Sequence, residues 1–275
     1  MNALLIGDSH ITALLQAHRA MQARGELAQD VTIALKRLGG GHILPTPFFS
    51  NEGDFAKITN SEYKLAFRQL PPKARRFGTL GLSMPLWPLR VMYQLVAQKI
   101  SLETSVDGLR PMSLALFERL VLEDQKYVIE LIEILHRSGT RVIAVAPPSL
   151  FRDHPIMSFH PANDALKMFA TYQKIMTTVM ERSNVHVIQV PERCLDAEGF
   201  MLAKYRHKDP KDSHHANAVF GKIMIREVEM WLRTRPAEAD EWLEMQAEKR
   251  AAYLLQNSSL AFHQRLIRKF RQLVR

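Results

Sequence analysis

The sequence has a single cysteine, Cys194, among its 275 residues, so no disulfide can form within the chain. A lone cysteine suits a reducing compartment, and we expect Cys194 to be a small structural residue. Long apolar runs are also missing, since no segment approaches the roughly 18 uninterrupted apolar residues of a membrane span. The N-terminus lacks the basic region and apolar core of a secretory signal. These absences predict a cytoplasmic protein.

Metal and nucleic-acid sites are not indicated either. The 11 histidines do not fall into a Cys/His ligand framework, so we expect no metal. Five of the nine net positive charges lie in residues 258–275, which leaves the rest of the chain only mildly basic. We therefore expect no general nucleic-acid surface.

A first motif follows a short apolar run, Asn2 to Ile6, that is typical of a buried parallel strand. Gly7 ends the run, and apolar residues from Ile11 onward recur at helical spacing. Ser9 is thus predicted at a strand-to-helix turn on the carboxyl edge of a sheet, where a hydroxyl is well placed for nucleophilic attack. The alternative is that Asp8 or Ser9 merely caps the helix.

A second motif lies near the other end of the sequence, where Asp212 and His215 are three residues apart. A turn there can place the carboxylate under the imidazole, leaving the second ring nitrogen to reach Ser9. A serine hydroxyl needs such a base, and the base needs an orienting group. Asp209 in place of Asp212, and His214 in place of His215, remain alternatives.

Gly7-Asp8-Ser9 after a first strand, with Asp212-x-x-His215-x-Asn217 before a last helix, resembles the SGNH (GDSL-like) hydrolases. The resemblance implies a three-layer α/β/α fold, with Ser9 as nucleophile, Asp212 as orienting acid and His215 as general base. It also implies an oxyanion site built from the serine amide, a glycine after the second strand and an asparagine after the third.

The residues expected at that oxyanion and substrate-binding site match the family pattern less closely. Glycines 39–41 follow the predicted second strand, with Gly40 as the expected donor, but Ser83 stands where the asparagine belongs. Asn51 and Asn60 are other possible donors from loops. Asp8, and His154 from a loop expected to overhang Ser9, complete the substrate-binding prediction.

The remaining pattern predicts a mainly parallel five-stranded sheet within one α/β domain, residues 1–234, because strands and helices alternate along the chain. Residues 42–76 are expected to be loop with a short helix near Ser61 to Gln69. Residues 235–275 are expected to form a helical extension with a basic amphipathic last helix, which can contact a membrane surface or a second copy of the chain.

Together these patterns favour a serine esterase that forms an acyl-enzyme on Ser9 and requires no metal or organic cofactor. An O-acyl group on a carbohydrate and a small lipid ester are both compatible substrates. A non-catalytic binding or assembly module of the same fold, and an acyltransferase, are the alternative hypotheses.

Overall fold

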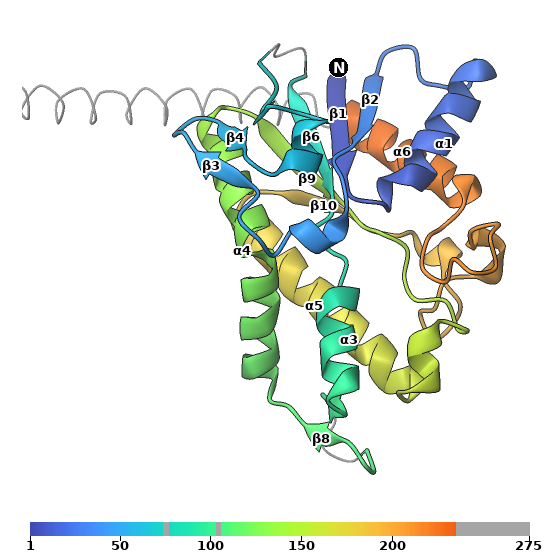
Figure 1. Ribbon diagram of the computed structural model, residues 1–275. Helices are drawn as coiled ribbons and strands as arrows, with labels where there is room; N and C mark the ends of the chain where they lie inside the picture. Colours follow the sequence, from blue (N-terminus) through green and yellow to red (C-terminus); the bar gives the residue numbers. More distant parts are fainter. Residues whose placement is uncertain (74–76, 103–105, 235–275) are drawn as a thin grey trace, which may run out of the picture.

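The computed structural model describes residues 1–73, 77–102 and 106–234 and is built around a five-stranded sheet (Figure 1). All strands of this sheet are parallel, in the order β10-β9-β6-β1-β2. Their bounds are Asn2–Gly7 for β1, Thr32–Arg37 for β2, Thr79–Ser83 for β6, Arg141–Val145 for β9 and His186–Ile188 for β10. The predicted parallel sheet is confirmed.

Helices cover both faces of this sheet, so the predicted three-layer sandwich is also confirmed. Helices α1 and α6 lie on one side, and α3, α4 and α5 lie on the other (Figure 1). Their bounds are Ile11–Ala23 for α1, Leu89–Ala97 for α3, Leu114–Arg137 for α4, Ala162–Arg182 for α5 and Ala218–Thr234 for α6.

The side chains on the two faces of each strand pack into two separate hydrophobic cores. In β1, Ala3 and Leu5 pack with the α1 and α6 residues, whereas Leu4 and Ile6 pack with α3, α4 and α5. Successive side chains of a strand point to opposite faces, so a strand covered on both sides must be apolar at every position. This is why the first strand reads as a continuous apolar run and shows no alternation.

The strand order reverses direction beside β1. The chain passes from β1 to β2 on one side and then crosses to β6 on the other, where Gly7 of β1 pairs with Ser83 of β6. In open parallel sheets, ligands bind at the carboxyl edge where the order reverses. The turn that carries Ser9 leaves the sheet at this point.

Helix α6 is held against α1 by a glycine contact. A Cβ atom on Gly221 would lie 2.1 Å from the carbonyl oxygen of Ala13 and 3.0 Å from the Cβ of Ala17. Only glycine allows the two helix backbones to approach this closely. The contact fixes the start of α6, and with it the loop that carries His215, relative to the turn that carries Ser9.

Residues 42–73 contain more regular structure than the sequence predicts. The short helix is present as α2, Ser61–Lys64, but three strands accompany it in a small antiparallel sheet: β3 Phe49–Asn51, β4 Ala56–Ile58 and β5 Gln69–Leu70. A further two-stranded pair joins β7, Ile100–Ser101, to β8, Arg110–Pro111. The prediction of loop for residues 42–76 is wrong where β3, β4 and β5 form.

The expected extension, residues 235–275, lies outside the described residues. Among residues 1–73, 77–102 and 106–234, no helix has the length and apolar character needed to cross a membrane. Cys194 is fully buried.

Candidate active site

The turn between β1 and α1 presents Ser9 without using its hydroxyl. Residue Ser9 is half-buried, its carbonyl accepts the N–H of Thr12 at 3.1 Å, and its side chain has no hydrogen-bond partner among the described residues. The N-cap of α1 is His10, with no side-chain cap, while the Asp8 carboxylate accepts the His10 N–H at 3.0 Å. Asp8 therefore shapes the turn and Ser9 does not cap the helix.

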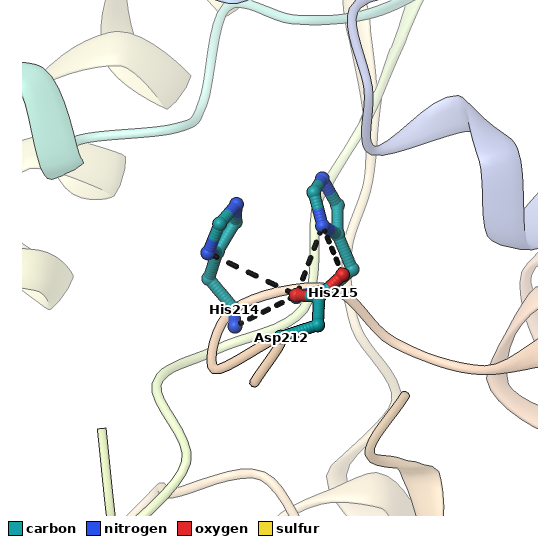
Figure 2. Close-up of side chains that lie close together, drawn as sticks. All are labelled: Asp212, His214 and His215. Atoms are coloured by element: carbon teal, nitrogen blue, oxygen red, sulfur yellow. Dashed lines mark hydrogen bonds and ion pairs between the residues drawn. The ribbon is translucent and has the colours of Figure 1, made fainter. Parts of the chain in front are cut away.

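A second loop, leading into α6, holds Asp212 against His215. Figure 2 shows the His214 and His215 rings projecting from this loop above the Asp212 carboxylate. His215 Nδ1 lies 2.8 Å from Asp212 Oδ2 and 3.0 Å from Oδ1, and the His215 N–H donates to Oδ1 at 3.0 Å. The carboxylate therefore fixes both the backbone and the ring of His215.

The two residues that the sequence left as alternatives, His214 and Asp209, make different contacts from those of His215 and Asp212. His214 Nδ1 lies 3.9 Å from the Asp212 carboxylate, beyond hydrogen-bond range. The Asp209 carboxylate accepts the Lys211 N–H at 2.9 Å, and contacts neither His214 nor His215 among the described residues. The His214 backbone N–H donates to Asp212 at 3.3 Å, but only the His215 ring, of the two histidine rings, is within hydrogen-bond range of the Asp212 carboxylate.

Asn217 anchors this loop. Its amide donates to the carbonyls of Lys204 at 2.8 Å and Arg206 at 2.9 Å, and its oxygen accepts the N–H groups of Val219 and Phe220 in the first turn of α6. One side chain thus caps α6 and joins the two sides of the loop.

The two loops meet through their histidines. The His10 ring, adjacent in sequence to Ser9, lies 4.8 Å from the His215 ring and 4.0 Å from Trp87, centroid to centroid. His215 Nε2 is buried and has no hydrogen-bond partner in the part of the chain that the structure describes. Since Nδ1 faces Asp212, Nε2 is the nitrogen available to an incoming group.

Burial keeps the surrounding imidazoles neutral. Loss of solvent lowers the pKa of His10 well below 6.5, and the charges of His215 and His214 act in the same direction. The pKa of His154 falls to about 4 through burial and the nearby His214, and that of His214 is lowered by burial and by His215. At neutral pH these rings are hydrogen-bonding groups, not cations.

The two carboxylates of the site have opposite shifts. Burial raises the pKa of Asp8 to about 6, although the His10 N–H and the charges of Arg90 and Arg37 oppose the rise. Burial also acts to raise the pKa of Asp212, but hydrogen bonds from the backbone and ring of His215 lower it to about 2. Asp212 is therefore ionised throughout the physiological range, as an orienting carboxylate must be.

The predicted oxyanion residues are only partly brought together. Ser83 lies beside Gly7 at the carboxyl end of β6, next to the Ser9 turn. The Gly40 N–H, however, donates to the Glu62 carboxylate at 2.5 Å, and the Gly40 carbonyl accepts the Tyr63 hydroxyl. The amide that was expected to face substrate is thus engaged with α2 in this structure.

Asparagines 51 and 60 are also engaged elsewhere. Asn51, on β3, donates to Glu130 at 3.2 Å and lies 3.5 Å from Arg137 Nη2. Because Arg137 ends α4 just before β9 begins, Asn51 lies toward the amino edge of the main sheet and not at the Ser9 edge. Asn60 caps α2 with its side-chain oxygen.

His154 lies where the overhanging loop was expected. Its Nδ1 accepts the Ile156 N–H at 3.2 Å, its buried Nε2 has no partner, and its ring lies 6.2 Å from that of Tyr93. The His214 charge acts on its pKa, which places it beside the loop of the Asp212–His215 pair.

One residue of this edge, Arg90, is not in the sequence prediction. It lies at the start of α3, and its charge acts on both Asp8 and His10, the two neighbours of Ser9. A sequence signal did exist: Arg90 is a lone cation among apolar α3 residues, and Asp124 interrupts the buried face of α4. A buried arginine needs a carboxylate partner, so the two could have been paired.

Asp212, His214 and His215 also offer one potential metal-ligand atom each, all within 4.8 Å of one another. Much of the proximity is the Asp212–His215 hydrogen bond itself, which a cation using the same two atoms would have to displace.

Comparisons with known proteins give fold-level likenesses. No family model matches the sequence, and no curated protein matches it significantly. The similar solved structures include esterases. One is a GDSL-like lipase from Bacteroides thetaiotaomicron, at 9% identity and a TM-score of 0.45, with 85% of this chain and 88% of that chain covered.

Two other solved structures have similar values. The acetylxylan esterase Axe2 from Geobacillus stearothermophilus shows 11% identity and a TM-score of 0.43, with 82% and 91% covered. The periplasmic domain of a lipopolysaccharide acetyltransferase from Salmonella ser. Paratyphi A shows 12% identity and a TM-score of 0.45, with 84% and 83% covered.

Proposed function

We propose that the protein is a serine esterase that forms an acyl-enzyme on Ser9. The observation that carries the proposal is the Asp212–His215 hydrogen bond at 2.8 Å, with His215 Nε2 buried and unpartnered beside the turn that presents Ser9. In this proposal, nucleophile, base and orienting acid come from two loops at one sheet edge. Activation of the serine further requires a hydrogen bond between Ser9 Oγ and His215 Nε2, which is not formed among the described residues.

In the proposed reaction, His215 Nε2 takes the hydroxyl proton as Ser9 Oγ attacks the ester carbonyl carbon. The carbonyl electron pair moves to oxygen and then returns as the alcohol leaves, taking the proton from His215. Water attacks the acyl-enzyme by the same route, with His215 again as base, and releases the acid. Asp212 remains ionised and stabilises the imidazolium.

The test uses p-nitrophenyl acetate and a fluorophosphonate probe. Ser9→Ala is expected to abolish both turnover and labelling, and Asp212→Asn to lower kcat by about 10⁴-fold because the ring loses its orientation. His215→Gln should be as damaging as Ser9→Ala, whereas His214→Gln, the matched control on the same loop, should retain most activity.

Two results would contradict the proposal. Turnover by Ser9→Ala at the wild-type rate would remove the nucleophile assignment. A folded wild-type protein that neither turns over the ester nor reacts with the probe would favour the binding-module hypothesis.

An acyltransferase shares the acyl-enzyme and differs only in the acceptor. Adding alcohols or sugars to the acetate assay separates the two activities. Acetyl transfer that exceeds hydrolysis at millimolar acceptor would assign transfer to this site. Carbohydrate and small lipid alcohols are the acceptor and leaving-group classes to compare.

A further inference from the structure

Arg90 is a partly buried cation whose orientation is fixed from one side. Its Nε and Nη2 donate to Asp124 Oδ1 and Oδ2 at 3.0 and 2.8 Å, and its side chain is 18% exposed. The carboxylate is itself held, since Asp124 Oδ2 also accepts from Gln125 Nε2 at 2.8 Å and from the Tyr172 hydroxyl at 2.9 Å. A fork-to-fork pair of this kind leaves the guanidinium little freedom to turn.

The third nitrogen of the guanidinium lies near Gly41 and Asp8, the residue before Ser9. Arg90 Nη1 has no hydrogen-bond partner among the described residues. A Cβ atom on Gly41 would lie 3.5 Å from Nη1 and 2.8 Å from Asp8 Oδ2, so both groups border the space that a side chain at position 41 would fill. Because residue 41 is glycine, this space is not taken by a side chain of its own.

Electrostatic coupling ties Arg90 to the residues on either side of Ser9. Its positive charge lowers the pKa of Asp8 against the effect of burial, and it lowers the pKa of His10 together with burial and His215. Because the imidazoles of His10, His154 and His214 are neutral at neutral pH, Arg90 supplies a permanent positive charge to this edge.

Acyl transfer at Ser9 needs a hydrogen-bond donor for the carbonyl oxygen as it becomes negative. Of the donors predicted from the sequence, the Gly40 N–H is bonded to Glu62 and the Asn51 amide to Glu130, whereas the Ser9 amide and Ser83 remain at this edge. Arg90 Nη1 is a pre-oriented, charged donor at the same edge, and a charged donor bonds an anion more strongly than a neutral amide does.

We propose that Arg90 donates from Nη1 to the oxyanion of the tetrahedral intermediate, with Asp124 as the positioning residue that aims it. This inference rests on the proposed acyl-enzyme chemistry of Ser9. No proton leaves the guanidinium in this role. The N–H···O contact strengthens as the carbonyl electrons move to oxygen and weakens when they return to expel the alcohol.

The experiment measures how fast a neutral alkyl fluorophosphonate labels Ser9, because its phosphoryl oxygen occupies the position of the oxyanion. Arg90→Lys keeps a cation for Asp124 and loses the forked Nη1 donor. We expect labelling to slow by about 100-fold to 1,000-fold, the effect of losing one oxyanion donor. The kcat for p-nitrophenyl acetate should fall equally, with KM unchanged.

Arg226→Lys is the matched control. Arg226 also pairs with a carboxylate, Glu229, but lies on α6 across the sheet, so its replacement should leave labelling at the wild-type rate. Thermal unfolding of both variants checks their folding. A second readout is chemical rescue, in which millimolar guanidinium, but not methylammonium, should restore labelling of Arg90→Ala. A purely structural role for Arg90 predicts no such selectivity.

The outcomes separate the two proposals. If the wild type is labelled at Ser9 and folded Arg90→Lys is labelled equally fast, the Arg90 role is refuted and the esterase proposal stands. An effect confined to KM for negatively charged esters also refutes it, because it assigns Arg90 to substrate charge. If the wild type is not labelled at Ser9, both proposals fail.

Discussion

Replacing Asp8 by asparagine should stabilise the protein at neutral pH. Asp8 is 2% exposed, and burial raises its pKa from 3.8 to about 6. Asparagine keeps the oxygen that accepts the His10 N–H and removes the charge that burial disfavours. The gain should therefore appear only where the wild-type carboxyl is ionised.

The sign and size follow from proton linkage. Well below pH 4 the Asp8 carboxyl is protonated in both the folded and unfolded chains. As the pH rises from about 4 to about 6, the unfolded chain releases its proton first, so the free energy of unfolding of the wild type falls. A pKa difference of about 2 units corresponds to a ceiling of about 3 kcal/mol, and the loss is complete above the folded pKa.

The assay is urea unfolding of wild type and Asp8→Asn across this pH range, followed by tryptophan fluorescence. The difference in free energy of unfolding should rise with pH in favour of Asp8→Asn and level off above about pH 6. Asp107→Asn, at an exposed turn position, is the control and should show no such rise. A difference that is constant with pH, or that favours the wild type as pH increases, would refute the reasoning.

Two further predictions concern the contact between two helices and the Arg90–Asp124 ion pair. Gly221→Ala should lower the free energy of unfolding by about 1–3 kcal/mol, because its Cβ meets the Ala13 carbonyl oxygen. Gly78→Ala is the control and should be near neutral, since a Cβ there meets nothing within 4 Å among the described residues. Equal urea midpoints for Gly221→Ala and the wild type would contradict the close contact. Asp124→Asn should cost about 3 kcal/mol or more, because it leaves the buried Arg90 charge without its partner; unfolding within error of wild type would show that Asp124 does not hold Arg90.

The main sheet could be predicted because its strands are buried on both faces. Such strands read as continuous apolar runs, and β1, β9 and β10 each follow or precede a clear helical pattern. The small sheet of β3, β4 and β5 lacks this signal, since its strands have two or three residues and lie among prolines and glycines. Their pairing depends on long-range contacts that no local pattern records.

The Asp212–His215 pair could be predicted for a local reason. The two residues are three apart, and one turn is enough to bring the carboxylate to the ring nitrogen. The choice between His214 and His215 is equally local in sequence, yet adjacent residues on a turn point in different directions. Only the folded loop shows which of the two faces Asp212.

The contacts of the Gly40 amide could not be predicted from the sequence. Glycines 39–41 were expected to face substrate, but α2 brings Glu62 onto the Gly40 N–H and Tyr63 onto its carbonyl. This contact joins residues 22 apart through a short helix, and nothing in either segment alone indicates it. Arg90 reaches the same edge from α3 through an equally non-local pair with Asp124. At the proposed site, the candidate donors are therefore positioned by how peripheral helices dock on the sheet edge, whereas the Asp212–His215 pair is positioned within one loop.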